Sequence, residues 1–461
     1  MITDDALREE RVAKAEELSA SLRGDGAQAI ALTYVDNSGV TRAKTIPVAR
    51  LGSASAWGIG MSPCFDLYYG PDLMTQSRLA GGPDGDLRLF PALESVTVLA
   101  AQPGWAWAPV DRYEQDGTPY GSCQRTFVRR VEAAAHDRGL VLTASFEVEF
   151  VLGLPAPDGS FRPAAQGPAY SMTRVIEQSD FCRDLLAALD TEGVPVEQLH
   201  PEYAAGQYEL SVAPLSLVGA ADRTVLVKQT IRAVAARHGL RVSFAPFVVA
   251  GGLGSGAHLH LGVRRGGANL FAGGDGPHGI TTDGGSFVAG VLAELPALTA
   301  IGAPAPVSYE RLQPSRWAGV YACWGRETRE AAVRFVTGMT GSEGRAANFE
   351  VKAFDGSANP YLVAGAVAAA GLAGLAAGTP LPPEITGDPG IWSEKERVAR
   401  GVRRLPTSLG EATALLERST VLGPVLGDPL LDTFVAVRRA EIEHAATLTP
   451  EAIVDAARWT Y

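Results

Sequence analysis

Two glutamates stand two residues apart in an apolar, strand-like segment, Ser145–Phe150, which reads SFEVEF. Side chains two positions apart in a strand lie on the same face, so Glu147 and Glu149 point the same way between apolar neighbours. Two carboxylates on one face of a core strand repel each other unless a cation or a proton lies between them. The segment therefore predicts a cation site on a sheet. A solvated outer face is the alternative that this motif alone leaves open.

Three later segments carry residue types that would complete such a site. They are Val196–Ser211 (VEQLHPEYAAGQYELS), Gly251–Gly262 (GGLGSGAHLHLG) and Phe349–Pro360 (FEVKAFDGSANP). The second places a His-x-His pair on one strand face, after glycines that let the backbone approach a ligand closely. A satisfied core histidine is the alternative there. The candidate residues are Glu197, Glu202, Glu209, His258, His260, Glu350 and Lys352.

The chemistry of these candidates indicates the kind of cation. Oxygen-rich ligands with one or two imidazoles suit Mg²⁺ or Mn²⁺ better than zinc. Fixed guanidinium groups beside such a cation favour phosphoryl transfer, because they neutralise developing charge. A solvated helix face is the alternative for Arg326 and Arg316. The segment Ser308–Phe335 holds Arg311, Arg316, Arg326, Arg329 and Arg334.

Composition excludes several other classes. The chain has 461 residues, with 40 Lys+Arg against 51 Asp+Glu and a net charge of −11. An acidic balance argues against a nucleic-acid binder, and we expect small-molecule substrates instead. The cysteines are far apart and form no CxxC pair, and the N-terminal segment has no apolar signal core, so we expect a cytoplasmic protein. The four cysteines are Cys64, Cys123, Cys182 and Cys323.

One uncharged stretch, residues 361–378 (YLVAGAVAAAGLAGLAAG), needs separate treatment. Its alanines and glycines give little transfer energy, so the composition predicts a buried helix and not a membrane span. Asn359 and Pro360 precede it as a helix cap and a first-turn proline would. No other segment resembles a span, and we expect no association with a membrane.

The pattern of elements changes after about residue 118. Residues 1–118 predict a helix over 5–24 followed mostly by short strands, and residues 119–461 alternate longer helices with strands. We therefore expect an α+β fold with a small β-rich domain (1–118) and a larger domain (119–461). The expected strands are 28–35, 40–48, 94–101, 140–152, 208–212, 242–247 and 257–263. The expected helices are 123–138, 179–191, 220–238 and three more in the last 130 residues.

The order of these motifs resembles the glutamine synthetase family. ExE-F is followed by glutamates around AGQYE, then GSGAHLH, SYERL…RETREAAVR and E-x-K…SANPYL. The resemblance implies an N-terminal β-grasp domain and a catalytic domain with an antiparallel sheet flanked by helices. It implies active sites at subunit interfaces of a homo-oligomer, a double-ringed dodecamer. It also implies a two-step reaction, in which ATP phosphorylates the γ-carboxylate of glutamate and an amine then displaces phosphate.

The resemblance implies roles for individual residues. Glu149, Glu202 and Glu209 would bind one divalent cation. Glu147, His258 and Glu350 would bind a second. Arg329 would face the transferred phosphoryl group. The implied nucleotide contacts are Glu197, His260, Arg334 and Arg345, and the implied glutamate contacts are Gly254, Arg311 and Lys352.

Two departures from the family change the predicted amine substrate. Trp317 stands where ammonia-using members have a glutamate that accepts a proton from ammonium. Ser62, with Asp66 close by, stands where they have an aspartate that helps to hold ammonium from the adjacent subunit. A buried ammonium ion needs a compensating carboxylate, whereas an indole offers an apolar wall or a cation–π face. We therefore place an amine pocket at Trp317 and Ser62.

The predicted function is an ATP-dependent ligase that joins glutamate to an organic amine, such as ethanolamine, a polyamine or another alkyl or aryl amine. Three alternatives stay open. The chain is a true glutamine synthetase that uses ammonium, a ligase for another acid, or a non-catalytic relative. The second alternative rests on Lys352 and Leu253, which replace an arginine and an asparagine of the family, because lysine loses the bidentate fork of arginine to a carboxylate.

Overall fold

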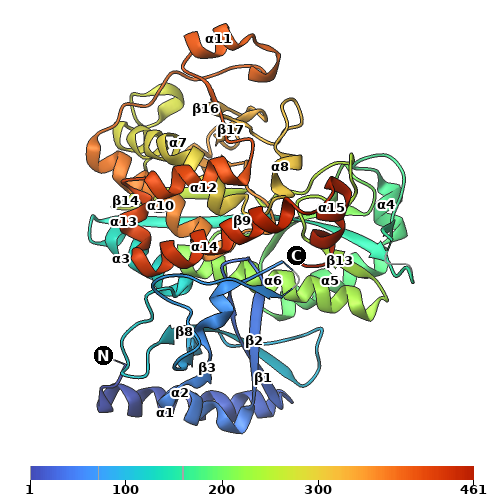
Figure 1. The fold of residues 1–461 in the computed structure, drawn as a ribbon, viewed down its shortest axis with the longest axis vertical. Helices are drawn as coiled ribbons and strands as arrows, with labels where there is room; N and C mark the ends of the chain where they lie inside the picture. Colours follow the sequence, from blue (N-terminus) through green and yellow to red (C-terminus); the bar gives the residue numbers. More distant parts are fainter. Residues whose placement is uncertain (1, 71, 158–159) are drawn as a thin grey trace.

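The computed structural model describes residues 2–70, 72–157 and 160–461 of the chain. Its N-terminal part, in blue at the lower end of Figure 1, consists of helix α1 (Asp5–Gly24) packed on a mixed sheet. Strand β1 pairs antiparallel with β2 and parallel with β8, in the order β2-β1-β8-β6-β3, and β7 also pairs with β8. A helix on such a sheet is consistent with the predicted β-grasp domain. The strands are β1 (Ala29–Val35), β2 (Thr41–Pro47), β3 (Ile59–Met61), β6 (Leu87–Pro91), β7 (Thr97–Val98) and β8 (Trp105–Tyr113).

Local chemistry explains the first hairpin and one wrong boundary. The Asp36 carboxylate accepts hydrogen bonds from the N–H groups of Ser38 and Val40, which closes the turn between β1 and β2. The strand expected over 94–101 is mostly absent. A 3₁₀ turn (Leu93–Ser95) precedes the two-residue β7, and the chain then turns back at Gly104, which has a positive φ, to begin β8.

The larger sheet has the order β11-β12-β9-β14-β18-β17-β16-β19. Its pairings are antiparallel except for β16 with β17. Alternate residues of the central strand β9, from Leu142 to Val148, are buried, and Glu147 on the opposite face is only half-buried. The strands are β9 (Leu140–Leu154), β11 (Val196–Pro201), β12 (Gln207–Val212), β14 (Leu259–Arg265), β16 (Tyr321–Arg326), β17 (Ala331–Val336), β18 (Asn348–Val351) and β19 (Arg403–Arg404).

Short strands and helices complete this part, and the predicted α+β class is confirmed. Strand β13 (Arg241–Ser243) is shorter than the strand expected over 242–247. The last 130 residues hold more helices than the three expected. Two of them, α14 and α15, have a proline in the first turn and follow closely behind earlier helices. The helices are α3 (Gln124–His136), α4 (Met172–Glu177), α5 (Ser179–Thr191), α6 (Leu217–Arg237), α8 (Ser308–Arg311), α9 (Glu343–Ala346), α11 (Glu394–Ala399), α12 (Leu409–Arg418), α13 (Leu422–Leu426), α14 (Asp428–Ala445) and α15 (Pro450–Arg458).

The uncharged stretch forms helix α10 (Pro360–Ala377), and Asn359 caps it as predicted by accepting from the N–H groups of Tyr361 and Leu362. It crosses helix α7 (Thr282–Gly302) at glycines, because a Cβ on Gly374 would lie 2.5 Å from the Gly290 Cα. Both helices are long and apolar enough to cross a membrane, and both are largely buried inside the protein. The expectation that only one segment resembles a span was therefore wrong.

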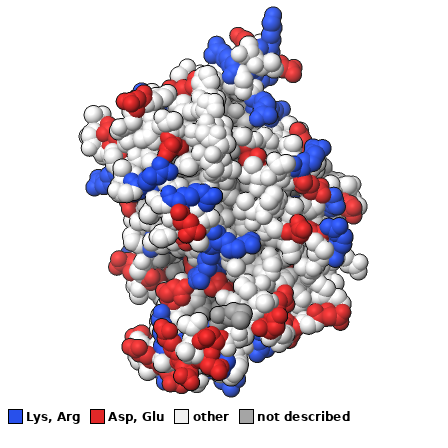
Figure 2. All heavy atoms as spheres, turned by 90° about the vertical axis from the view of Figure 1, so that its left-hand side faces the viewer, with Lys and Arg blue, Asp and Glu red and all other residues white. Residues whose placement is uncertain are grey.

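The C-terminal helices return to the N-terminal part. Arg438 on α14 donates to the backbone oxygen of Asn37 over 2.9 Å, and Asn359 donates to the oxygens of Val35 and Asp36. The domain boundary at residue 118 stays a prediction. On the face shown in Figure 2, charges of both signs are interspersed, and acidic side chains gather at its lower end, over the N-terminal part.

Candidate active site

The open face of the larger sheet aligns candidate ligands in two rows. In the first row, His200 on β11 lies opposite Glu209 on β12, and Glu209 lies opposite Glu149 on β9. Directly opposite residues of neighbouring strands lie on the same face, so register alone brings these three side chains together. Glu147 lies two residues from Glu149 on this face, as its alternation predicted.

The second row crosses the strands on the other side of β9. His260 on β14 lies opposite Glu350 on β18, and Glu350 lies opposite Arg334 on β17. Arg334 donates to Glu350 over 3.1 Å and also to Glu327 over 2.7 Å. The Lys352 ammonium lies 2.9 Å from the other oxygen of Glu350, which is only 1% exposed. Glu350 is thus held by two cationic groups.

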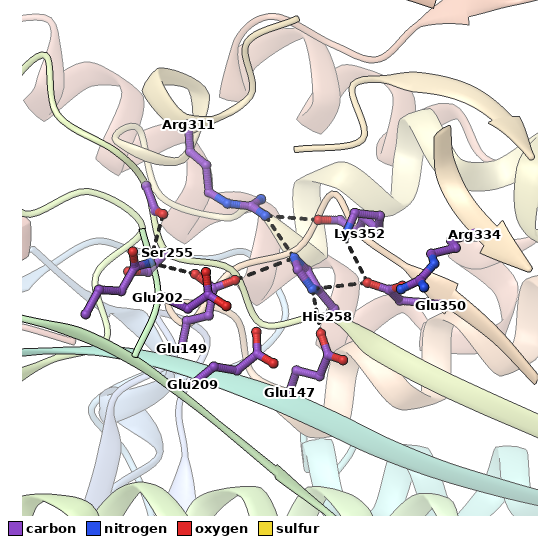
Figure 3. A network of polar contacts seen from close by, with 12 residues as sticks. Glu147, Glu149, Glu202, Glu209, Ser255, His258, Arg311, Arg334, Glu350 and Lys352 are labelled. Carbon is purple, nitrogen blue, oxygen red and sulfur yellow. Dashed lines mark hydrogen bonds and ion pairs between the residues drawn. The ribbon is translucent and has the colours of Figure 1, made fainter. Parts of the chain in front are cut away.

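His258 joins the two rows, as Figure 3 shows. Its Nδ1 lies 2.8 Å from a Glu147 oxygen and 3.2 Å from a Glu350 oxygen. Its Nε2 lies 3.8 Å from a Glu149 oxygen and 3.2 Å from the Arg311 guanidinium, which reaches in from helix α8. One nitrogen therefore faces two carboxylates, an arrangement that a shared cation would satisfy.

The cluster opens into a cavity of about 700 Å³. Most predicted site residues line this cavity. They are Glu147, Glu149, Glu202, Glu209, Gly254, His258, Arg311, Trp317, Arg329, Arg334, Glu350 and Lys352. Four predicted residues do not line it, namely Ser62, Glu197, His260 and Arg345.

The four residues outside the cavity lie in different places. His260 is behind Glu147, 3.0 Å from its carboxylate, with its other nitrogen 2.9 Å from Asn348. Glu197 and Arg345 are exposed, and Glu197 lies at an irregularity in the pairing of β11 with β12. Ser62 begins a short 3₁₀ turn in the N-terminal part and accepts from the Cys64 N–H. Their implied ligand contacts stay predictions.

The crowded carboxylates have unequal proton affinities. Burial, together with the charges of Glu147 and Glu149, raises the pKa of Glu209 to about 7. Although burial opposes ionisation of Glu147, hydrogen bonds from His258 and His260 lower its pKa. Burial favours the neutral His260 ring, but the hydrogen bond to Glu147 prevails and raises the His260 pKa to about 9. The repulsion that acts on Glu209 is what a bound cation would relieve.

The donor set fits a divalent cation that prefers oxygen. Three groups of side chains each place their ligand atoms within 4.8 Å of one another. Each group combines carboxylates with one imidazole. These groups differ from the two ligand sets that the family resemblance implies. One group combines Glu209 with Glu147 and His258, and another includes His200. Assignment of each ligand to an ion therefore stays a prediction. The groups are Glu147–Glu209–His258, Glu147–His260–Glu350 and His200–Glu202–Glu209.

Two glycines leave the room that the site needs. A Cβ on Gly256 would lie 2.6 Å from His258 Nε2 and 2.9 Å from a Glu149 oxygen, and so would fill the space between them. A Cβ on Gly254 would lie 2.7 Å from the Arg311 side chain. The glycine-rich segment thus lets backbone pass close to the site, as expected, although Gly256 was not singled out.

Several side chains of the cavity escaped the sequence analysis. His200 stands two residues before Glu202 in the segment Val196–Ser211, and strand alternation could have identified it. Gln207 donates to Glu149 over 2.8 Å, and the Tyr170 hydroxyl donates to Glu202. No pattern marked Tyr170, because it reaches the site from the loop before α4. Tyr203 also lines the cavity, beside Trp317.

Trp317 stands on a tightly held loop. Its ring is 46% exposed at the cavity, and both Trp317 and Ser315 have a positive φ of 57°. The Trp317 N–H donates to the buried carboxylate of Glu330 over 2.9 Å, and the Ser315 hydroxyl donates to Asp388 over 2.7 Å. These contacts stabilise a backbone conformation that non-glycine residues rarely adopt.

Asp66 is the carboxylate that stands near Ser62 in the sequence. It is fully buried, and one of its oxygens accepts from Arg112 over 2.7 Å. Its other oxygen has no hydrogen-bond partner among the described residues, but the burial of the whole side chain keeps it away from solvent. Asp66 does not line the cavity of its own chain, and whether it or Ser62 takes part in amine binding stays a prediction.

Comparisons with known proteins agree with this geometry. The family model described as glutamine synthetase, catalytic domain, matches residues 121–455. Gamma-glutamylpolyamine synthetase GlnA3 of Streptomyces coelicolor is 54% identical, over 98% of this chain and 97% of its own length. Glutamine synthetase of Halobacterium salinarum is 30% identical, over 91% of each chain.

Solved structures show the same relationship. A crystal structure titled as a novel glutamine synthase homolog is 33% identical and superimposes with a TM-score of 0.84, over 94% of this chain and 99% of its own. A GmaS/ADP complex is 26% identical, with a TM-score of 0.81, over 94% and 97%. The fold and the site thus define an ATP-dependent carbon–nitrogen ligase. The chain belongs to the glutamine synthetase family, whose members use ATP and divalent metals.

Proposed function

We propose that this ligase joins the γ-carboxyl group of glutamate to an organic amine of the polyamine class, with release of ADP and phosphate. The observation that carries the proposal is Trp317, an indole at the cavity where ammonia-using relatives have a carboxylate. Similarity over almost the whole chain to a relative named as a gamma-glutamylpolyamine synthetase supports the same class of amine. The burial of Asp66 and its bond to Arg112 support it as well, because a fully buried carboxylate is less accessible to ammonium.

The residues of the cavity have different proposed roles in the reaction. The carboxylates and His258 would hold two divalent cations, Mg²⁺ or Mn²⁺, which supply charge neutralisation for phosphoryl transfer when bound. Arg329 stabilises negative charge on the transferred phosphoryl group, and Arg334 neutralises charge on the nucleotide phosphates. Arg311 and Lys352 bind the carboxylates of glutamate, beside Gly254. Trp317 forms the amine side of the cavity and excludes water from the acyl phosphate.

The choice of nucleophile provides the first test. We expect at least one organic amine to exceed ammonium in kcat/KM by tenfold or more, at saturating glutamate and ATP. Tenfold corresponds to about 1.4 kcal/mol of transition-state preference. Phosphate release is measured over ammonium, ethanolamine, alkylamines and polyamines. A tenfold preference for ammonium would instead identify a glutamine synthetase with an unusual ammonium site.

Assembly provides the second test. Ser62 lies outside the cavity of its own chain, so we propose a homo-oligomer, a dodecamer by family resemblance, in which this segment meets the cavity of a neighbour. The activity is expected to coincide with the oligomer peak in size-exclusion chromatography with light scattering, and dilution to the monomer should abolish it. Full activity in a monomer would contradict the proposed shared site.

A further inference from the structure

A continuous row of aromatic rings lines one side of the cavity. The Trp317 ring meets the Tyr203 ring edge to face, with centroids 5.0 Å apart, and Tyr203 meets Tyr170 in the same way at 5.5 Å. Tyr170 stacks on His200 at 5.2 Å. The row thus runs from the loop that carries Trp317 to the predicted metal ligands. All four rings line the cavity.

The outer two rings are open to the cavity and are not part of the hydrophobic core. Trp317 is 46% exposed and Tyr203 is 42% exposed. Among the described residues, none hydrogen-bonds the Tyr203 hydroxyl. Adjacent exposed aromatic faces in a concave site are suited to binding hydrocarbon and organic cations, since the ring faces carry negative potential.

An acidic side chain lines the same cavity without a partner. Glu310 is exposed, and no described residue forms an ion pair or hydrogen bond with its carboxylate. It precedes Arg311, which is turned toward His258 and Lys352. The cavity also contains the guanidinium groups of Arg316 and Arg329, which repel cations. Away from the predicted metal ligands, the aromatic rings and the Glu310 carboxylate are therefore what the cavity offers to a cationic group.

We propose that Trp317, Tyr203 and Glu310 form a binding site for the far end of the amine, and that its ligand is an aliphatic diamine or longer polyamine. The inference rests on the proposed function and adds which residues recognise the amine substrate. The reacting amine lies toward the metal cluster, the carbon chain lies along Tyr203 and Trp317, and the second ammonium group lies against the rings and the Glu310 carboxylate. A monoamine of the same chain length lacks the last contact.

The first experiment compares 1,4-diaminobutane with 1-butylamine at saturating glutamate and ATP. We expect kcat/KM for the diamine to exceed that for the monoamine at least tenfold. The Tyr203→Ala variant should lose about tenfold in kcat/KM for the diamine, mainly through KM. Tyr203→Phe keeps the ring and should stay within twofold of the wild type. KM for ATP and for glutamate should not change in either variant, which separates amine binding from a general structural defect.

The charge of Glu310 is tested in the same assay. Glu310→Gln should reduce the preference for diamine over monoamine three- to fivefold, with little change for 1-butylamine, as expected for an exposed ion pair. Glu451→Gln, at an exposed position on α15, is the matched control and should leave the preference unchanged. Added salt should weaken the diamine preference of the wild type but not that of Glu310→Gln.

The outcomes separate the inference from the proposed function. If amines are substrates but the monoamine equals the diamine, or if Tyr203→Ala keeps the full preference, the inference is wrong and the amine ligase stands. If ammonium is the only substrate, the proposed function fails and the inference fails with it. A loss in Tyr203→Ala that Tyr203→Phe shares would also overturn it, because it would then depend on the hydroxyl and not on the ring.

Discussion

Replacement of Glu149 with glutamine should reduce ATP-dependent phosphate release at least a thousandfold, a loss of about 4 kcal/mol of transition-state stabilisation. Glu149 on β9 lies opposite Glu209 on the neighbouring strand β12. Its carboxylate accepts a hydrogen bond from Gln207 and lies 3.8 Å from His258 Nε2. Glutamine keeps the volume of the side chain and its bond to Gln207 but removes one negative charge from the predicted metal ligands. The expected defect is therefore in metal-dependent chemistry and not in folding.

The measurement combines turnover, metal titration and thermal unfolding. Mn²⁺ should be needed at higher concentration, and the melting temperature of the metal-free variant should equal or exceed that of the wild type, because one repelling charge is gone. Glu192→Gln is a matched control: Glu192 is 9% exposed, against 8% for Glu149, but bonds Thr230 and Ala100 outside the cavity. Near-normal turnover in Glu149→Gln would refute its assignment as a metal ligand.

Replacement of Arg329 with alanine should lower kcat at least a hundredfold while KM for ATP and glutamate changes little. Arg329 lines the cavity, is exposed, and among the described residues has no side-chain partner. A free guanidinium costs no internal contact when it is removed, so the melting temperature should stay the same. Arginines that neutralise a transferring phosphoryl group contribute about a thousandfold or more in phosphoryl transfer.

Two further variants, Arg329→Lys and Arg326→Ala, test whether the effect is specific to the Arg329 guanidinium. Arg329→Lys should recover part of the rate, because lysine keeps the charge but loses the planar fork. Arg326→Ala removes an exposed arginine three residues away that does not line the cavity, and should retain normal kcat. A rate loss of equal size in Arg326→Ala would indicate a general charge effect and contradict a specific role for Arg329.

Some side-chain positions at the cavity follow from the strand pattern of the sequence, and others do not. Strand alternation predicted that Glu147 and Glu149 share a face, and they do, because side chains alternate along any strand. The same reasoning could have included His200, two residues before Glu202. It could not place Glu197, because the irregular pairing of β11 with β12 interrupts the alternation at that point.

In the sequence, the amine side of the site depended on two departures from the family, at Trp317 and Ser62. Trp317 marked the position, and the structure added Tyr203, which lies against it from a different turn of the chain. Tyr203 and Glu310 lie in segments that the sequence marks for their glutamates and arginines, but no local pattern distinguishes these two residues themselves. Similarly, the sequence left Asp66 open as an alternative to Ser62, and only the structure shows that it is buried and bonded to Arg112.

The sequence by itself determined most of the helices and strands, the residue types of the predicted metal site and the family, because these depend on periodicity, caps and motifs along a short stretch of chain. Only the tertiary structure decided which ligands meet. Antiparallel register sets His260 opposite Glu350 and Glu209 opposite Glu149, and register is a property of strand pairs far apart in sequence. The aromatic side of the cavity likewise joins loops more than a hundred residues apart, whose approach depends on packing of the whole domain.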